Sequence, residues 1–267
     1  MPEGPEVLKN TDFLNNELCG KNIVDTKIVS GRYLRHGPFD GFNVMKNKKL
    51  KINDVKCKGK FIYFNFSDGS SLWSTLGMSG VWQNKPTKHN RFIIKTDDTI
   101  IYYNDTRNFG TLKYVLSSLE LSKKLSSLGP DILGSHINQN KVRERFLKKP
   151  NKTIAECLMD QSVISGVGNY LKAEILYACK ISPNRLCKDI SVQDYALIIN
   201  TSRKIAKLSY EMGGATLSTY RQPNGKKGLY TRRFAVYNQK ISPCGFEVVK
   251  EKTHDKRTTH WVPSVQI

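Results

Sequence analysis

Residues 160–170 read Asp-Gln-Ser-Val-Ile-Ser-Gly-Val-Gly-Asn-Tyr and lie between two segments with helical periodicity. Gly166 and Gly168 let the backbone approach a phosphate closely, and the amides that begin the following helix point toward an anion. A tight turn between two helices needs the same residues. In a chain with a formal net charge of +20, the pattern favours a phosphate clamp over a plain turn.

The segments around this loop predict a helical half of the chain. Helical spacing covers residues 142–147, 154–159, 170–179 and 195–211, and Gly213-Gly214 follows the last of these. Upstream, residues 128–134 read Leu-Gly-Pro-Asp-Ile-Leu-Gly, and alternation gives way to helical periodicity there. The Gly and Pro residues make a natural hinge. A domain boundary is therefore predicted at this point.

Strands are predicted before the hinge. Short runs rich in Ile, Tyr, Phe and Thr, separated by turn residues, occupy 22–30, 60–66, 71–73, 91–96 and 100–103. Strands at this spacing are typical of a sandwich or a barrel. One helix precedes them, because apolar residues from Val7 to Leu18 keep near-helical spacing ahead of Gly20. After the helices, runs at 235–237, 246–250 and 258–262 predict a small hairpin appendage.

Composition limits the class of protein. With 267 residues, 39% hydrophobic and 10% aromatic, the chain does not fit collagen-like, coiled-coil or wholly disordered classes. No run approaches the roughly 18 apolar residues of a membrane helix, and the acidic start differs from a signal peptide. We therefore expect a soluble protein, nuclear or cytoplasmic, that is not secreted. The excess of 43 basic over 23 acidic side chains fits a surface that meets phosphates, although simple solubility charge explains it equally well.

The six cysteines form no Cys-x-x-Cys pair. This spacing argues against a zinc ribbon, a thioredoxin-type motif and a dense disulfide framework. We expect free thiols and a reducing compartment.

The first six residues, Met-Pro-Glu-Gly-Pro-Glu, offer a nucleophile. Removal of Met1 leaves Pro2 with a secondary α-amine that titrates near about pH 8, whereas a Lys side chain titrates near about 10.4. A partly neutral amine attacks an electrophilic carbon to form an iminium, and Glu3 beside it can exchange protons. The alternative is an ordinary disordered start.

Together these pieces resemble the formamidopyrimidine-DNA glycosylase and endonuclease VIII family of base-excision repair enzymes, over nearly the whole chain. Eight motifs match in the family's order: Pro2–Glu6, Gly59-Lys60, Leu76–Gly80, Asp105–Gly110, Leu128–Asp131, Ser165–Asn169, Gly213–Thr216 and Val236-Tyr237.

The resemblance implies catalytic roles for a small set of residues. Pro2 would attack C1′ of the damaged nucleotide, and Glu3 would protonate the deoxyribose ring oxygen. Lys60 would contact a phosphate beside the lesion and assist β-elimination. Glu6 would support the active-site helix or supply only its first-turn charge. For Glu174, a buried structural pairing explains the residue as well as catalysis does.

Other matching positions would bind DNA. Asn169 and Gly168 would hold phosphates from the glycine turn, aided by Lys152 and Tyr237. His89 and Arg91 lie in a basic stretch that would touch the DNA backbone. An extruded base leaves a hole in the stack, and Met78, Arg107 and Phe109 match the family's void-filling positions. Core or turn packing is the alternative for these three.

The chain departs from the family near its end. Most bacterial members close with a zinc finger of two Cys-x-x-Cys pairs, but only Cys244 is present here, and His260-Trp261-Val262-Pro263 replaces the second pair. Cys244 with His254 and His260 would be an irregular ligand set. We predict no zinc and no other cofactor, and a hairpin similar to the zincless finger of some eukaryotic and viral members. Arg257 matches that finger's DNA-contacting arginine and would assist δ-elimination.

The sequence as a whole predicts an α+β protein. A catalytic β-sandwich would span 1–130, a hinge 131–140, a helix-two-turn-helix domain 141–230, and a zincless-finger hairpin 231–267. DNA would lie in a basic cleft between the domains. The expected partner is double-stranded DNA with oxidised bases or abasic sites, bound by a monomer.

The resemblance implies a bifunctional DNA glycosylase and abasic-site lyase that cuts by β,δ-elimination. Gly4 looks like the endonuclease VIII branch, which prefers oxidised pyrimidines, although the loop Leu217–Lys227 is long enough to leave purine lesions open. Two alternatives stay open. One is a non-catalytic nucleic-acid-binding protein, and the other is a lyase that processes only abasic sites.

Overall fold

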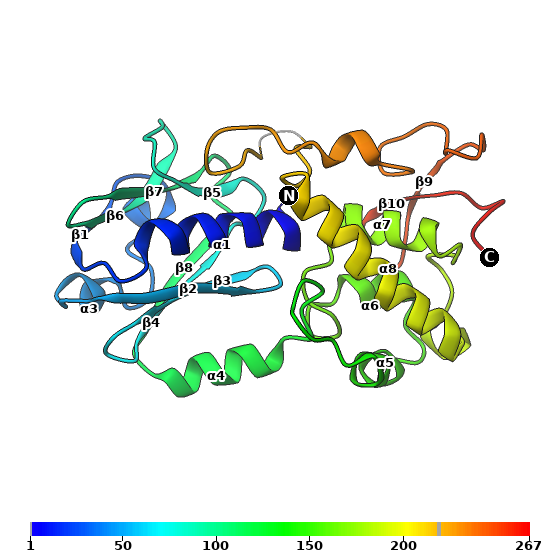
Figure 1. The fold of residues 1–267 in the computed structure, drawn as a ribbon, viewed down its shortest axis with the longest axis horizontal. Helices are drawn as coiled ribbons and strands as arrows, with labels where there is room; N and C mark the ends of the chain where they lie inside the picture. The colour runs from blue at the N-terminus through cyan, green and yellow to red at the C-terminus, as the bar shows by residue number, and fades with distance from the viewer. Residues whose placement is uncertain (1, 218–219) are drawn as a thin grey trace. The chain divides into compact units, whose positions relative to one another are not determined.

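A computed structural model describes residues 2–217 and 220–267, which form two compact units (Figure 1). The first unit comprises Pro2, Glu6–Ser126 and the described part of Gly213–Gly228, and the second comprises Glu3–Pro5, Ser127–Met212 and Leu229–Ile267. Strands dominate the first and helices the second, so the predicted α+β class is confirmed. Within the described ranges, no helix is long and apolar enough to cross a membrane.

The first unit contains two four-stranded antiparallel sheets. One has the order β1-β6-β7-β5, from β1 (Ile23–Ile28), β5 (Gly80–Gln83), β6 (Asn90–Thr96) and β7 (Ile100–Asp105). The other has the order β2-β3-β4-β8, from β2 (Ile52–Lys58), β3 (Phe61–Phe66), β4 (Ser71–Thr75) and β8 (Thr111–Val115). The short helices α2 (Arg32–Arg35) and α3 (Phe42–Lys46) connect β1 to β2, and α4 (Ser118–Ser127) follows β8.

One hydrophobic core joins the two sheets. Phe64 of β3 and Trp82 of β5 are fully buried, and their ring centroids lie 5.3 Å apart. Leu14 from helix α1 (Gly4–Leu18) belongs to the same cluster. The inner faces of both sheets thus form the predicted sandwich, which is held by burial of large apolar side chains.

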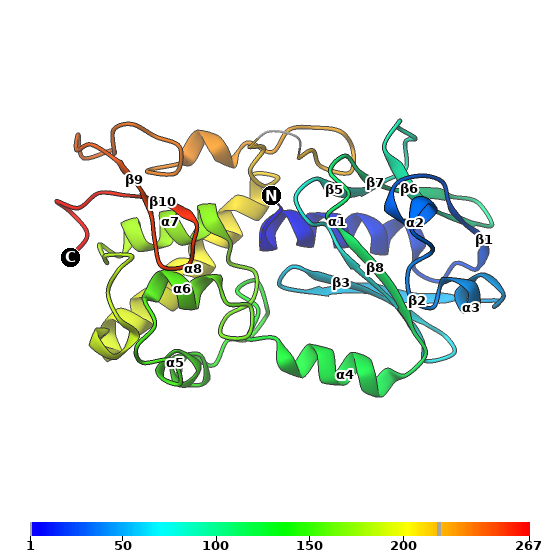
Figure 2. The same ribbon diagram turned by 180° about the vertical axis from the view of Figure 1, so that it is seen from behind.

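Helix α1 also covers one edge of each sheet; Figures 1 and 2 show it running beside both. Asn10 accepts a hydrogen bond from the backbone N–H of Trp82 in β5 (2.9 Å). Asn15 accepts one from the N–H of Val55 in β2 (2.9 Å). Both strands are edge strands, whose outward N–H groups otherwise need water or another chain. The helix therefore accepts one outward N–H group from each of these two edge strands.

The second unit consists mainly of helices. They are α5 (Gln139–Leu147), α6 (Ile154–Met159), α7 (Asn169–Ala178) and α8 (Val192–Glu211), with the 3₁₀ turns η1 (Cys187–Asp189) and η2 (Tyr230–Arg233). Helix α6 begins at the predicted residue because Thr153 and Glu156 form a capping box. The loop between α6 and α7 is pinned by two hydrogen bonds, from Ser165 N to Pro130 O (2.9 Å) and from Ile132 N to Ser165 O (3.1 Å).

The end of the chain forms a two-stranded antiparallel hairpin. Strand β9 (Val249–Lys252) pairs with β10 (Thr258–Trp261). The strand-like run predicted at 235–237 is wrong, because no strand forms there and the backbone amides are used in another way, described below.

Candidate functional site

Pro2 lines a cavity of about 190 Å³ in the first unit. The other lining residues are Val7, Lys60, Thr75, Leu76 and Gly77. Lys60 comes directly after Gly59, which takes a positive φ of 59° at the turn between β2 and β3. The structure thus brings together two of the predicted catalytic residues, Pro2 and Lys60, at one cavity.

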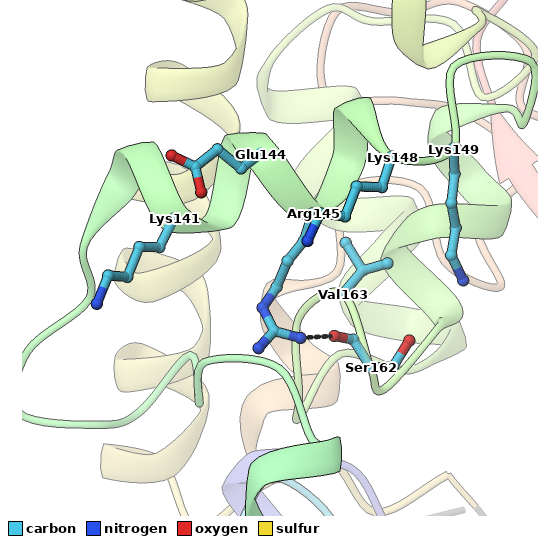
Figure 3. Close-up of a pocket in the computed structure, with 7 residues that line it drawn as sticks. All are labelled: Lys141, Glu144, Arg145, Lys148, Lys149, Ser162 and Val163. Carbon is cyan, nitrogen blue, oxygen red and sulfur yellow. Dashed lines mark hydrogen bonds between the residues drawn. The ribbon is translucent and has the colours of Figure 1, made fainter.

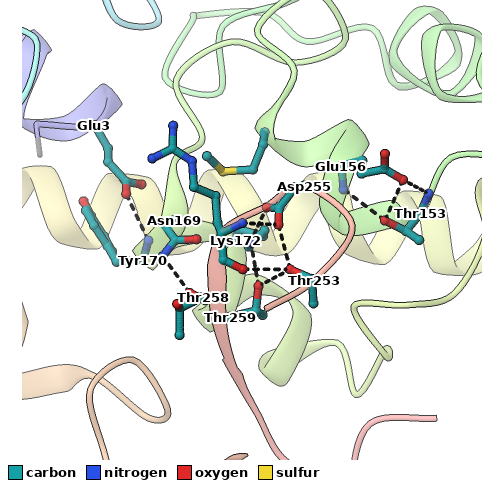
Figure 4. Close-up of polar contacts among 12 residues, drawn as sticks. Glu3, Thr153, Glu156, Asn169, Tyr170, Lys172, Thr253, Asp255, Thr258 and Thr259 are labelled. Atoms are coloured by element: carbon teal, nitrogen blue, oxygen red, sulfur yellow. Dashed lines mark hydrogen bonds and ion pairs between the residues drawn. The ribbon is translucent and has the colours of Figure 1, made fainter. Parts of the chain in front are cut away.

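Glu3 is 2% exposed, and its carboxylate binds the first turn of α7. It accepts hydrogen bonds from the backbone N–H of Tyr170 (2.9 Å) and of Leu171 (3.2 Å) (Figure 4). A carboxylate at a helix N-terminus is favoured by the unpaired N–H groups and by the helix dipole.

The position of the Glu3 carboxylate explains why residue 168 is a glycine. A Cβ at position 168 would lie 2.5 Å from Oε1 and 2.6 Å from Cγ of Glu3. We predicted that the glycine and the helix amides approach a phosphate. In the structure, the space beside Gly168 and the amides of Tyr170 and Leu171 are taken by Glu3, because the chain's own carboxylate supplies the anion.

Asn169 links the start of α7 to the hairpin. Its Nδ2 donates to the backbone oxygen of Thr258 (3.0 Å), whereas its Oδ1 is buried without a hydrogen-bond partner among the described residues. Burial raises the pKa of Tyr237, and the Asn169 side chain opposes that rise. Two of the predicted DNA-binding residues, Asn169 and Tyr237, therefore lie together.

Glu174 organises the segment that was predicted to be a strand. Its carboxylate accepts from the backbone N–H of Ala235 (2.8 Å), Val236 (3.0 Å) and Tyr237 (2.8 Å). Burial raises the pKa of Glu174, and the three amides oppose this shift. The structural interpretation of Glu174 thus has a definite form, since the residue holds the segment that carries Tyr237.

Glu6, in the first unit, is another buried carboxylate that binds a backbone amide distant in the sequence. It is fully buried, and its Oε1 accepts from Ala215 N (2.6 Å). Gly214, with a positive φ of 83°, leaves room for this carboxylate. Burial, and then the charge of Glu6, raise the pKa of Tyr220, whose hydroxyl has no hydrogen-bond partner among the described residues.

Two of the three predicted void-filling residues lie on one exposed loop. Phe109 is 54% exposed, and the Arg107 guanidinium carbon lies 4.9 Å from its ring centroid. Asp105 holds the loop by accepting from Ser79 Oγ (2.5 Å) and Gly110 N (2.8 Å). The loop therefore presents an aromatic ring and a cation from a braced backbone.

The remaining predicted DNA contacts have partners within the protein or lie half-buried. Arg91 donates to the backbone oxygen of Asp105 (2.7 Å) and to Ser30 Oγ (2.8 Å), so it braces the loop after β7. Lys152 forms an exposed ion pair with Glu156 (2.8 Å). Met78 and His89 are half-buried.

The hairpin residues do not fit a zinc site. Cys244 is exposed, and its Sγ lies 3.3 Å from the hydroxyl of Tyr177. The ring of His260 packs on Tyr237 with centroids 4.8 Å apart, and burial lowers its pKa. Within residues 2–217 and 220–267, no group of three or more His, Cys, Asp or Glu side chains is placed to hold a metal ion.

Sequence reasoning missed Lys172 and Asp255, which form an ion pair of 2.5 Å. Their side chains are 0% and 4% exposed. A charged residue within the apolar pattern of α7 was the available signal, because lysine is almost never fully buried without a partner.

A second concave surface lies on the helical unit (Figure 3). It has a volume of about 310 Å³ and is lined by Lys141, Glu144, Arg145, Lys148, Lys149, Ser162 and Val163. Arg145 donates to the backbone oxygen of Ser162 (2.7 Å), which joins α5 to the loop before α7. Basic side chains form most of this lining, so the groove adds to the positive surface of the protein.

Family models match nearly the whole chain. The N-terminal domain of formamidopyrimidine-DNA glycosylase matches residues 1–112, its H2TH domain matches 128–221, and its C-terminal domain matches 230–267. The chain belongs to the formamidopyrimidine-DNA glycosylase family. The predicted family is thereby confirmed, whereas the endonuclease VIII-like branch stays a prediction.

Individual members of the formamidopyrimidine-DNA glycosylase family are similar over their full length. The enzyme of Ureaplasma parvum serovar 3 is 31% identical over 280 residues, covering 100% of both chains, and that of Cronobacter sakazakii is 30% identical, covering 98% of both. The structure of MutM (Fpg) from Thermus thermophilus superposes with a TM-score of 0.87 at 27% identity, covering 99% of this chain and 98% of the other. Fpg from Lactococcus lactis, in complex with DNA containing an abasic site, gives a TM-score of 0.85 at 26% identity and 99% coverage of both.

Proposed function

We propose that this protein excises oxidised bases from double-stranded DNA through a covalent intermediate on Pro2, and then cleaves the strand at the resulting abasic site. Membership of a DNA glycosylase family supports the excision step. The observation that supports the covalent step is the cavity that Pro2 shares with Lys60, because the proposed nucleophile and a cation that can bind a phosphate line the same space.

The chemistry follows from the α-amine that removal of Met1 exposes. The Pro2 nitrogen bonds to C1′, the bond from C1′ to the base breaks, and the base leaves with a proton. Protonation of the ring oxygen O4′ by Glu3 then breaks the C1′–O4′ bond and gives the iminium. The iminium makes the C2′ proton acidic, so that β-elimination breaks the C3′–O bond and δ-elimination breaks the C5′–O bond. Glu3 handles protons at the sugar, Lys60 binds the neighbouring phosphate, and Arg257 assists the second elimination.

DNA binding is supported by charge and by similar complexes. The chain carries a net charge of +20, and Lactococcus lactis Fpg is bound to DNA containing an abasic site or Fapy-dG in matching structures. We propose that Asn169 and Tyr237 contact the DNA backbone, and that Phe109 and Arg107, together with Met78, fill the space left by the extruded base. We propose a monomer as the active form.

Oxidised pyrimidines are the proposed preferred lesions. This part rests on Gly4 alone, and the structure gives Gly4 a packing role. Its N–H donates to Gly166 O (2.8 Å), and a Cβ on it would lie 3.1 Å from the Cα of Gly166. The substrate panel must therefore include purine lesions, and the loop Leu217–Lys227 lies partly outside the described residues.

Borohydride trapping tests the proposal. Purified protein is incubated with duplexes that contain an oxidised pyrimidine, 8-oxoguanine, a formamidopyrimidine or an abasic site. A covalent adduct that Pro2→Gly abolishes supports the nucleophile, and base release from intact lesions separates a glycosylase from a lyase that acts only on abasic sites. Absence of any adduct, from protein shown by mass spectrometry to lack Met1, would refute the proposed function.

A further inference from the structure

The turn that carries Arg257 is built around one buried carboxylate. Asp255 Oδ1 accepts from Arg257 N (3.0 Å) and from Thr253 Oγ1 (2.7 Å). Thr253 N also donates to Arg257 O (3.1 Å), and Lys256 takes a positive φ of 60° between them. The conformation next to Arg257 therefore depends on Asp255.

Lys172 of α7 provides the partner for that carboxylate. Its Nζ lies 2.5 Å from Asp255 Oδ2 and donates to Thr259 Oγ1 (2.8 Å). The hydroxyls of Thr259 and Thr253 are hydrogen-bonded at 2.7 Å, which closes a ring of four side chains (Figure 4). All four side chains lie in the protein interior, so the ring is shielded from solvent and salt.

The same helix turn also holds Glu3. Tyr170 and Leu171, which bind the Glu3 carboxylate, immediately precede Lys172. Burial lowers the pKa of Lys172, the contact with Asp255 opposes this shift, and the charges of Glu3 and Arg257 both act on it. One turn of α7 is thus the common support for two of the proposed catalytic side chains.

Besides this ring, the hairpin is held by the hydrogen bond from Asn169 to Thr258 O, by the packing of His260 on Tyr237 and by a small apolar cluster. This cluster lies between α7 and the hairpin segment. Its buried members among the described residues are Ala173, Val236, Val248 and Val262, with Tyr177, Tyr237 and Val265 packed against them. A two-stranded hairpin is marginal by itself. A buried charge is costly unless it is paired, so this pair favours one register of the turn over others.

We propose that Lys172 and Asp255 are positioning residues that fix the turn bearing Arg257 to helix α7, and so govern the second elimination. This inference rests on the proposed function. It predicts that loss of the pair leaves the chemistry of Pro2 largely intact and impairs the step that needs Arg257.

The experiment compares wild type, Lys172→Met, Arg257→Ala and the double variant on a duplex with one abasic site. A denaturing gel separates the β-elimination end from the phosphate end that δ-elimination leaves. We expect Lys172→Met to keep borohydride trapping within about threefold and to lower the δ/β product ratio about tenfold. The double variant should be no worse than Arg257→Ala, because coupled residues are not additive. Lys207→Met, at an exposed pair with Glu211 (3.9 Å), is the matched control.

Hydrogen exchange gives a readout that needs no activity. Amides of residues 253–258 should exchange at least about tenfold faster in Lys172→Met than in wild type, whereas those of α1 should not change. If Lys172→Met does not fold, Asp255→Asn provides the second variant, because it keeps one acceptor oxygen but removes the charge. If the wild-type protein forms no trapped adduct, the proposed function is refuted. The exchange data would still decide whether Lys172 and Asp255 fix the turn that bears Arg257.

Two results would overturn the inference. One is an unchanged product ratio together with unchanged exchange at 253–258. The other is an equal loss of trapping and of δ-product in a folded variant, because a general structural defect predicts that result.

Discussion

Replacing Gly168 with alanine separates two explanations for this glycine. The backbone there has φ −132° and ψ −160°, which any residue adopts, so the change introduces no backbone strain. The added Cβ would lie 2.5 Å from Oε1 and 2.6 Å from Cγ of Glu3. Because Glu3 is 2% exposed, the carboxylate must leave its position and lose the hydrogen bonds from Tyr170 and Leu171.

The expected cost follows from those two bonds. A hydrogen bond to a charged group contributes about 1.5–3 kcal/mol, and the helix N-terminus loses its compensating charge. We expect Gly168→Ala to lower the free energy of unfolding by about 2–4 kcal/mol, since water replaces part of the loss. Urea denaturation measures this quantity, and base release measures the displacement of Glu3.

A double-mutant cycle provides the control. In a Glu3→Ala background the clash is absent, so Gly168→Ala should be neutral or stabilise the protein by about 0.4–1 kcal/mol through the unfolded chain. If Gly168→Ala costs as much in that background as in wild type, the reasoning is wrong. An unchanged stability with a loss confined to DNA affinity would instead favour the phosphate interpretation of Gly168.

Four further predictions follow from the site. Glu174→Ala should lower the free energy of unfolding by about 2–4 kcal/mol, because three amides lose their acceptor; Glu174→Gln, which keeps one acceptor oxygen, should lose less in the same urea titration, and equal losses would contradict the account. Burial lowers the pKa of the His260 imidazole, so the unfolded chain binds a proton on this imidazole more tightly than the folded chain does. The stability that neutral, buried His260 contributes is therefore present above about pH 6.5 and is lost as the pH falls below it. His260→Gln should therefore remove part of the loss of stability between pH 7 and pH 5, and an identical pH profile would rule this out. Phe109→Ala should change stability by less than about 0.5 kcal/mol but slow base release from duplex about tenfold, whereas unchanged release would exclude a wedge role. Dialysis against a chelator should leave Tm unchanged, and a fall of more than about 2 °C would reveal a structural metal.

Local signals explain which elements were predictable. The bounds of α6 were predicted to the residue from helical spacing, and a capping box within four consecutive residues fixes its start in the structure. Strand β2, Ile52–Lys58, was missed because only Ile52 and Val55 are buried in it and mostly polar or charged residues fill the rest. The segment 235–237 carries the apolar residues of a strand, yet its amides pair with a carboxylate about sixty residues earlier. The sequence of the segment itself therefore gives no indication of that partner.

The residues of the site likewise divide into those that a local motif identified and those whose role depends on contacts distant in the sequence. The identity of Pro2, Lys60 and Arg257 as candidates came from motifs, and the structure places Pro2 and Lys60 at one cavity. The contacts of Glu3 with Tyr170 and Leu171 join residues more than 160 positions apart. Such contacts depend on how the helices pack, so the reason for Gly168 was visible only in three dimensions.

The contacts of helix α1 bear on how firmly the segment that begins with Pro2 is held. Chain ends usually fray, because few contacts hold them. Here the helix that follows Pro2 is fastened through Asn10 to one sheet and through Asn15 to the other, so it cannot unwind without exposing both edges. The proposed nucleophile therefore precedes a helix whose middle turns open only when the edges of both sheets lose their partners.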